Sequence, residues 1–137
     1  MIHFAKYWLP VCLYLLLIVT LSSLSKPLVP QPGWFEIDKL YHLIEYGILS
    51  FLFLRAFMNS SRRILSGDAV FFTVLATIIF GLTDEIHQAF VPGRSSNIFD
   101  WLFDSIGAVA GVLALRLWLK IYAKVRFTKS KNTNRKR

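Results

Sequence analysis

Residues 81–100 gather carboxylates, an imidazole, an amide and a guanidinium between two long apolar runs. Glu85 is followed by His87 and Gln88, and Arg94 comes after a short turn-forming segment. Side chains of these types bind phosphate, hydrogen-bond sugars or transfer protons. Ionisable groups next to lipid are costly, so those that are present usually serve a function. We therefore expect a polar site at the surface of a membrane.

Residues 38–46 carry a second polar group, whose spacing fits one side of a helix. Asp38, His42 and Glu45 follow an i, i+4, i+7 pattern, and Lys39 and Tyr46 lie on the neighbouring row. Side chains three and four residues apart meet on a helix surface. This helix is predicted to present a broad polar face at its beginning.

A third polar group opens the last apolar run. Asp100 and Asp104 continue into Gly107 and Gly111 at i, i+4, i+7, i+11. Small residues at such positions let a neighbouring helix approach closely. The spacing predicts a helix bundle that is polar at one end and closely packed below that end.

The composition is that of a membrane protein. The chain has 137 residues, 55% of them hydrophobic, with a mean hydropathy of +0.50. One small core cannot bury so many apolar residues. Apolar segments at residues 7–24, 40–58, 69–86 and 100–122 predict an all-α, polytopic protein with four transmembrane helices. They form one membrane domain, residues 1–122, followed by a basic tail at 123–137.

The formal net charge of +8 predicts the orientation in the membrane. Residues 120–137 contain lysines and arginines but no acid, Lys6 lies in the amino-terminal segment, and Arg55, Arg62 and Arg63 lie at the second connection. Because short basic segments stay in the cytoplasm, both termini are predicted to be cytoplasmic, with the three polar groups on the outer face. The tail is expected to attract anionic lipids, and nucleic-acid binding is not predicted.

The remaining segments admit alternatives. Residues 7–24 also fit a cleavable signal peptide, but a retained helix is favoured because three more apolar segments follow. Residues 25–37 form a predicted loop because Pro27, Pro30 and Pro32 break regular structure. Ser96 or Asn97 is the expected N-cap of the last helix.

Several polar residues also have a purely structural interpretation. Asp38 and Asp100 carry charges that a helix N-terminus favours. Arg94 fits an ion pair with Glu85 or Asp104 at a rim of low dielectric constant. These interpretations compete with a binding site at the same positions.

The combined spacing of the three polar groups resembles that of the VanZ-like membrane proteins, a family named after an accessory protein of teicoplanin resistance. The resemblance spans residues 38–111, and one position departs from it, since the family commonly has Asn where this chain has Asp104. It implies a small, multi-pass helical protein of the bacterial cytoplasmic (inner) membrane that, in some members, lowers susceptibility to lipoglycopeptide antibiotics. The positions that carry it are Asp38, Lys39, His42, Tyr46, Gly81, Glu85, Gln88, Phe90, Pro92, Arg94, Asp100, Asp104 and Gly107.

The favoured function is binding of a cell-envelope lipid headgroup, such as a lipid-linked cell-wall precursor. Lys39 and Arg94 are expected to contact phosphate, the arginine through a two-pronged arrangement. The sequence leaves the exact ligand and the oligomeric state open. The predicted ligand-binding residues are Lys39, His42, Glu45, Tyr46, Glu85, Gln88, Arg94, Asp100 and Asp104.

The alternative is a hydrolase or transferase that acts on a phosphate-containing lipid. Its catalytic candidates are His42, Glu85 and Asp38, with His42 oriented by Asp38 or Glu45. A metal-dependent variant of this enzyme would use His42, Glu45, Glu85 and Asp100 as ligands. No compact metal motif supports that variant, so neither a metal nor another cofactor is predicted. Transport is disfavoured because the middles of the apolar segments carry no charge.

Overall fold

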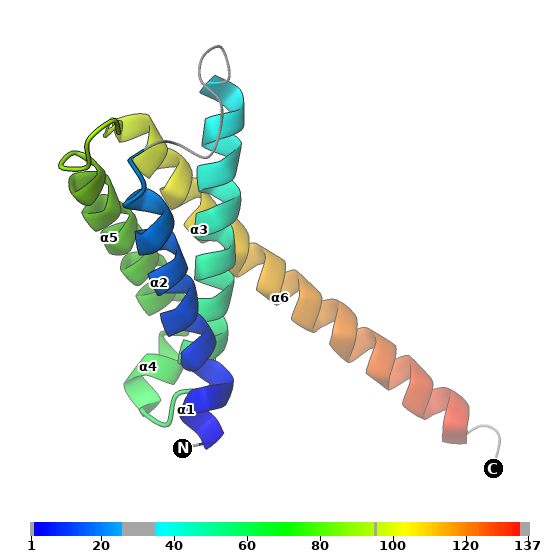
Figure 1. Cartoon of the computed structure of the whole chain (residues 1–137). Helices are drawn as coiled ribbons and strands as arrows, with labels where there is room; N and C mark the ends of the chain where they lie inside the picture. The colour runs from blue at the N-terminus through cyan, green and yellow to red at the C-terminus, as the bar shows by residue number, and fades with distance from the viewer. Residues whose placement is uncertain (1, 26–34, 95, 135–137) are drawn as a thin grey trace.

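A computed structural model of the protein describes residues 2–25, 35–94 and 96–134, with side chains from 38 onward in the second range and up to 126 in the third. The described residues form a bundle of α-helices (Figure 1). The helices are α1 (Ile2–Tyr7), α2 (Leu9–Ser22), α3 (Phe35–Met58), α4 (Arg63–Gly67), α5 (Ala69–Gln88) and α6 (Ile98–Asn134).

Three of these helices are long and apolar enough to cross a membrane within the described ranges. They are Asp38–Met58 of α3, Ala69–Gln88 of α5 and Ile98–Arg126 of α6, and α2 is a shorter apolar helix. Large apolar side chains such as Leu16, Ile79 and Leu113 are exposed on the outside of the bundle. In a membrane protein these side chains face lipid. The predicted all-α membrane fold is therefore confirmed.

The first apolar segment is divided by a local irregularity at Trp8. Pro10, in the first turn of α2, has no backbone N–H to donate to the carbonyl of Lys6. The backbone nevertheless continues across Trp8, whose N–H donates to the carbonyl of Phe4 at 2.8 Å, and the N–H of Cys12 donates to the carbonyl of Trp8 at 2.9 Å. The two short helices therefore follow one another with little interruption.

Glycines bring α3 and α6 into close contact. A methyl group placed on Gly107 would lie 2.5 Å from the carbonyl oxygen of Leu43, and one on Gly111 would overlap the carbonyl oxygen of Gly47. Beside them, the hydroxyl of Ser50 donates to the carbonyl of Ala108 at 2.5 Å. The small-residue stripe predicted from the sequence is thus the contact that sets the crossing of these two helices.

The polar ends of three helices meet at one end of the bundle. The start of α3, the end of α5 and the start of α6 lie together there, and both termini lie toward the opposite end (Figure 1). The indole N–H of Trp101 on α6 donates to the carbonyl of Ile78 on α5 at 3.1 Å. The start of α6 is therefore held against α5 near this end, and the glycine contact holds α6 against α3.

Several element boundaries differ from the sequence-based expectation. Helix α3 begins at Phe35 instead of residue 40, and α4 occupies part of the connection between the segments predicted at 40–58 and 69–86. Helix α6 continues to Asn134, through the boundary predicted at residue 122, because no glycine or proline follows Gly111 to end it. The division into a membrane domain and a tail stays a prediction. Most of the predicted loop 25–37 lies outside the described residues.

Candidate functional site

A cavity of about 430 Å³ opens at the polar end, between α2, α3 and α5. The lining residues from α5 are polar, those from α2 are mainly apolar, and α3 contributes residues of both kinds. The polar lining consists of Ser22, Asp38, His42, Glu45, Asp84, Gln88 and Arg94. The remaining lining residues are Tyr14, Leu17, Ile18, Leu21, Tyr41, Ile44 and Ile48.

His42 stands in the cavity wall and is held from behind by Asp104. Its Nδ1 lies 2.9 Å from Oδ1 of Asp104, whose side chain is 1% exposed. Gly81 of α5 makes room for this carboxylate, since a methyl group there would lie 3.0 Å from Oδ2 of Asp104. The expectation that Asp38 or Glu45 orients His42 is therefore corrected: the hydrogen-bonded carboxylate is Asp104, because the close crossing of α3 and α6 brings it to the imidazole.

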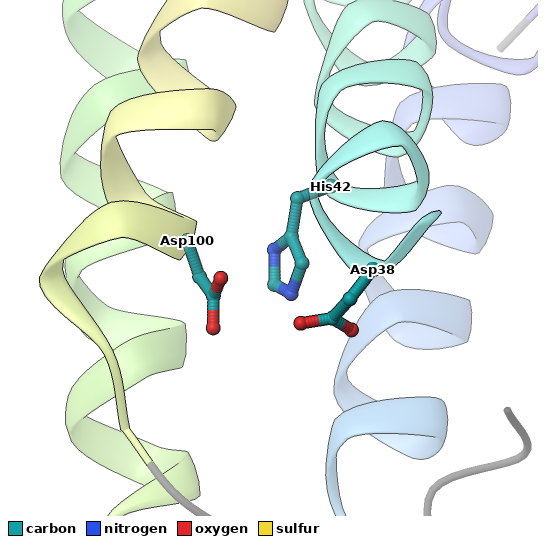
Figure 2. A group of neighbouring side chains, drawn as sticks. All are labelled: Asp38, His42 and Asp100. Carbon is teal, nitrogen blue, oxygen red and sulfur yellow. The ribbon is translucent and has the colours of Figure 1, made fainter. Parts of the chain in front are cut away.

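Lys39 is buried beside the start of α6. Its ammonium group forms an ion pair with Asp100 and lies 3.4 Å from Oδ2 of Asp38. Figure 2 shows the carboxylates of Asp38 and Asp100 directed toward the ring of His42 from two different helices. The lysine thus compensates the acidic charges at this point and is absent from the cavity lining.

Glu85 positions the beginning of α6. Its Oε2 accepts a hydrogen bond from the backbone N–H of Asn97 at 2.8 Å, and the side chain of Asn97 accepts one from the N–H of Phe99 at 3.0 Å. Asn97 is therefore the N-cap, one of the two residues predicted for that role. One turn away on α5, the amide of Gln88 donates to Oδ2 of Asp84 at 2.8 Å.

Arg94 reaches the end of α2. Its Nη2 donates to the carbonyl of Leu21 at 2.7 Å and its Nε to the carbonyl of Leu24 at 3.2 Å. The ion pair expected with Glu85 or Asp104 is not what the structure shows. The last carbonyls of a helix lack partners within the helix, and a cationic side chain satisfies them well.

The predicted ligand-binding residues therefore fall into two layers. His42, Glu45, Gln88 and Arg94 line the cavity, together with the catalytic candidate Asp38. The second layer is buried behind them and contains Lys39, Tyr46, Glu85, Asp100 and Asp104. Their roles toward a ligand stay predictions.

Asp84 is the acidic cavity residue that the sequence-based set of site residues omitted. It lies one turn before Gln88, and this i, i+4 spacing was the available signal. Tyr14 was also missed, and its hydroxyl donates to the carbonyl of Glu45 at 3.3 Å. Nothing in the apolar segment around Tyr14 indicates that it faces a polar helix.

The site brings together hydrogen-bond acceptors, an imidazole, and side chains of the kinds that bind metal ions. Two groups of side chains bring possible ligand atoms within 4.8 Å of one another, one of Asp38, His42 and Asp100, and one of His42, Glu85 and Asp104. The cavity itself presents carboxylates and Gln88 to a ligand's hydrogen-bond donors, and one guanidinium to an anion.

No curated protein and no solved structure matches this sequence. The sequence does match a protein family, over a range that includes every residue of the cavity and of the layer behind it. The sequence matches the VanZ/LLP1 family over residues 4–119, and the protein is therefore a membrane protein of the VanZ/LLP1 family.

Proposed function

We propose that this VanZ/LLP1 protein binds the headgroup of a cell-envelope lipid in the cavity between α2, α3 and α5. The observation that carries the proposal is the two-sided lining of the cavity, polar toward α5 and apolar along α2. Ligand sites that combine an apolar wall with a few convergent polar groups are suited to amphipathic molecules. A lipid presents that combination where its headgroup joins its chain.

The polar lining favours a headgroup with many hydrogen-bond donors. Asp38, Glu45 and Asp84 contribute acceptors, and Gln88 contributes an amide. Sugar hydroxyls and amino groups are donors of the matching kind. Arg94 is the cationic residue in the lining, so a phosphate belongs at its side of the cavity. A sugar-bearing, lipid-linked cell-wall precursor has both features.

Lys39 has a different role from the phosphate contact expected from the sequence. Its ammonium is buried against Asp100, and moving it to a ligand would leave that buried carboxylate uncompensated. Lys39 instead holds α3 and α6 together behind the cavity.

The proposal includes four membrane crossings with both termini in the cytoplasm of a bacterial cell. From Ile2 to Ser22 the nearly continuous α1 and α2 extend about 31 Å, close to the thickness of a bilayer's hydrocarbon core. The cavity then faces outside, where cell-wall precursors are used, and the basic tail meets anionic lipids inside. Shielding such a precursor would change teicoplanin susceptibility.

Binding is tested with the full chain in nanodiscs. The probe is undecaprenyl diphosphate carrying a disaccharide peptide, and undecaprenyl phosphate without a sugar is the comparison. We expect the first lipid to bind more tightly, and Glu45→Gln or Gln88→Leu to weaken its binding about tenfold through lost hydrogen bonds.

The matched control is Asp68→Asn, an exposed residue at the other end of α5. It should leave the affinity unchanged. Equal binding of the two lipids, or equal affinity of all variants, would mean that the cavity is not the headgroup site.

A second candidate function is hydrolysis or transfer at the phosphate of such a lipid. One observation favours it: His42 lines the cavity and its Nδ1 is held by Asp104, an arrangement suited to a general acid or base. Release of inorganic phosphate from undecaprenyl diphosphate, lost in His42→Gln, would establish this activity. Binding without any release supports the binding function alone.

A further inference from the structure

We propose that His42, Glu85 and Asp104 form a binding site for a divalent first-row metal ion, with Zn²⁺ or Mn²⁺ as the matching ions. The three residues come from α3, α5 and α6, so the ion joins the helices whose polar ends meet. Binding of the ion does not require a lipid in the cavity.

The ligand atoms are already close. One atom from each residue lies within 4.8 Å of the other two. Metal bonds of about 2.0–2.2 Å place two ligand atoms at most about 4.4 Å apart, so a small inward movement of these side chains completes the site.

Two buried carboxylate oxygens lack partners. Oε1 of Glu85 and Oδ2 of Asp104 have no hydrogen bond among the described residues, although the residues are only 4% and 1% exposed. The other oxygen of each carboxylate is occupied, by the N–H of Asn97 and by His42. Burying a carboxylate oxygen without a partner is costly. A metal ion bonded to both oxygens removes that cost.

The charge balance favours the group of His42, Glu85 and Asp104 over the other group, which combines His42 with Asp38 and Asp100. Asp38 and Asp100, which also surround His42 (Figure 2), have the ammonium of Lys39 between them. Within the described part of the chain, neither Glu85 nor Asp104 is paired with a lysine or arginine. Two carboxylates at low dielectric attract a divalent cation strongly.

The imidazole selects the kind of ion. Carboxylates alone suit Mg²⁺ and Ca²⁺, whereas imidazole together with carboxylates suits Zn²⁺ and Mn²⁺. Metal-bound histidines commonly donate their other ring N–H to a carboxylate, which fixes the ring. Here the ion displaces the proton of Nδ1 of His42 and bonds both this nitrogen and Oδ2 of Asp104. The ring N–H that remains is on Nε2, on the side of the carboxylates of Asp38 and Asp100 (Figure 2). His42 also lines the cavity, which provides the route of entry.

The proposed ligand set differs from the metal-dependent variant considered from sequence alone. Asp104 replaces Glu45 and Asp100 as a ligand. Glu45 lines the cavity and Asp100 is paired with Lys39, whereas Asp104 lies behind His42. The helix crossing, which the sequence does not specify, decides between these acids.

The test uses the full chain in detergent, stripped with a chelator and titrated with Zn²⁺, Mn²⁺ or Mg²⁺. We expect one equivalent of Zn²⁺ or Mn²⁺ to bind, with weaker binding of Mg²⁺. Glu85→Gln and Asp104→Asn should each lower the affinity at least about tenfold. His87→Gln is the control for adventitious binding, because this histidine is exposed and its Nε2 lies 2.9 Å from the hydroxyl of Ser23 on the α2 side, and it should leave the affinity unchanged.

Electron spin-echo spectroscopy of Mn²⁺ bound to the wild-type protein tests the site even if a variant does not fold. The wild-type protein should show nitrogen coupling from one imidazole. No stoichiometric ion, no nitrogen coupling, or a loss of affinity in Asp38→Asn but not in Glu85→Gln would overturn the proposed site.

Discussion

Nδ1 of His42 lies 2.9 Å from Oδ1 of Asp104, and this hydrogen bond joins α3 to α6 directly above their glycine contact. It links the cavity wall to the buried layer behind it. The orientation of the imidazole toward the cavity therefore depends on how closely the two helices approach.

Removing the acceptor at Asp104 should destabilise the protein even without a metal. Asp104→Ala leaves Nδ1 of His42 without its partner in a mostly buried position, which costs about 1–3 kcal/mol. Asp104→Asn keeps an acceptor oxygen and should cost less. Unfolding in mixed micelles, with a chelator present, measures both changes. Equal losses for the two variants would show that the hydrogen bond is not what Asp104 contributes.

The glycine contact can be tested separately from the polar site. The added methyl group of Gly111→Ala overlaps the backbone of Gly47, which cannot move aside as a side chain can. We expect a loss of about 2 kcal/mol or more in the same unfolding measurement. Gly67→Ala is the control, since nothing lies within 4 Å of a methyl group there. Similar effects at both positions would contradict the close approach of α3 and α6.

The sequence predicts which helix ends are polar but not how their side chains pair. Charges such as Glu85 and Asp100 stand out against apolar runs, so their common level in the bundle follows from the alternating direction of the helices. The Gly107 and Gly111 stripe likewise follows from spacing alone. These features are local along the chain, and the structure shows them as expected.

Partners that depend on the relative placement of two helices could not be predicted. Asp104 meets His42 because of the crossing of α3 and α6, and Arg94 meets the carbonyls of Leu21 and Leu24 because α2 ends beside it. Several acids have suitable spacing, so spacing alone does not choose among them. For the same reason the spacing did not indicate the ion pair of Lys39 with Asp100.

Arg94 should hold the end of α2 in place. Arg94→Ala removes two hydrogen bonds from a charged donor, and we expect a loss of about 2 kcal/mol. Amide hydrogen exchange should accelerate in the last turn of α2 and remain unchanged in the middle of α6. Arg62→Ala, at an exposed position on the other side of the bundle, is the matched control. Unchanged exchange in α2 would show that Arg94 is not needed there.

Filling the apolar side of the cavity tests the central claim, that this cavity holds the lipid, most directly. Ile48 lines the cavity and is 44% exposed, whereas Ile79, 52% exposed, lies on the outer face of α5 and outside the cavity. The measurement is the affinity for the disaccharide-peptide lipid in nanodiscs. We predict that Ile48→Trp abolishes binding and Ile79→Trp preserves it, and unchanged binding by Ile48→Trp would contradict the claim.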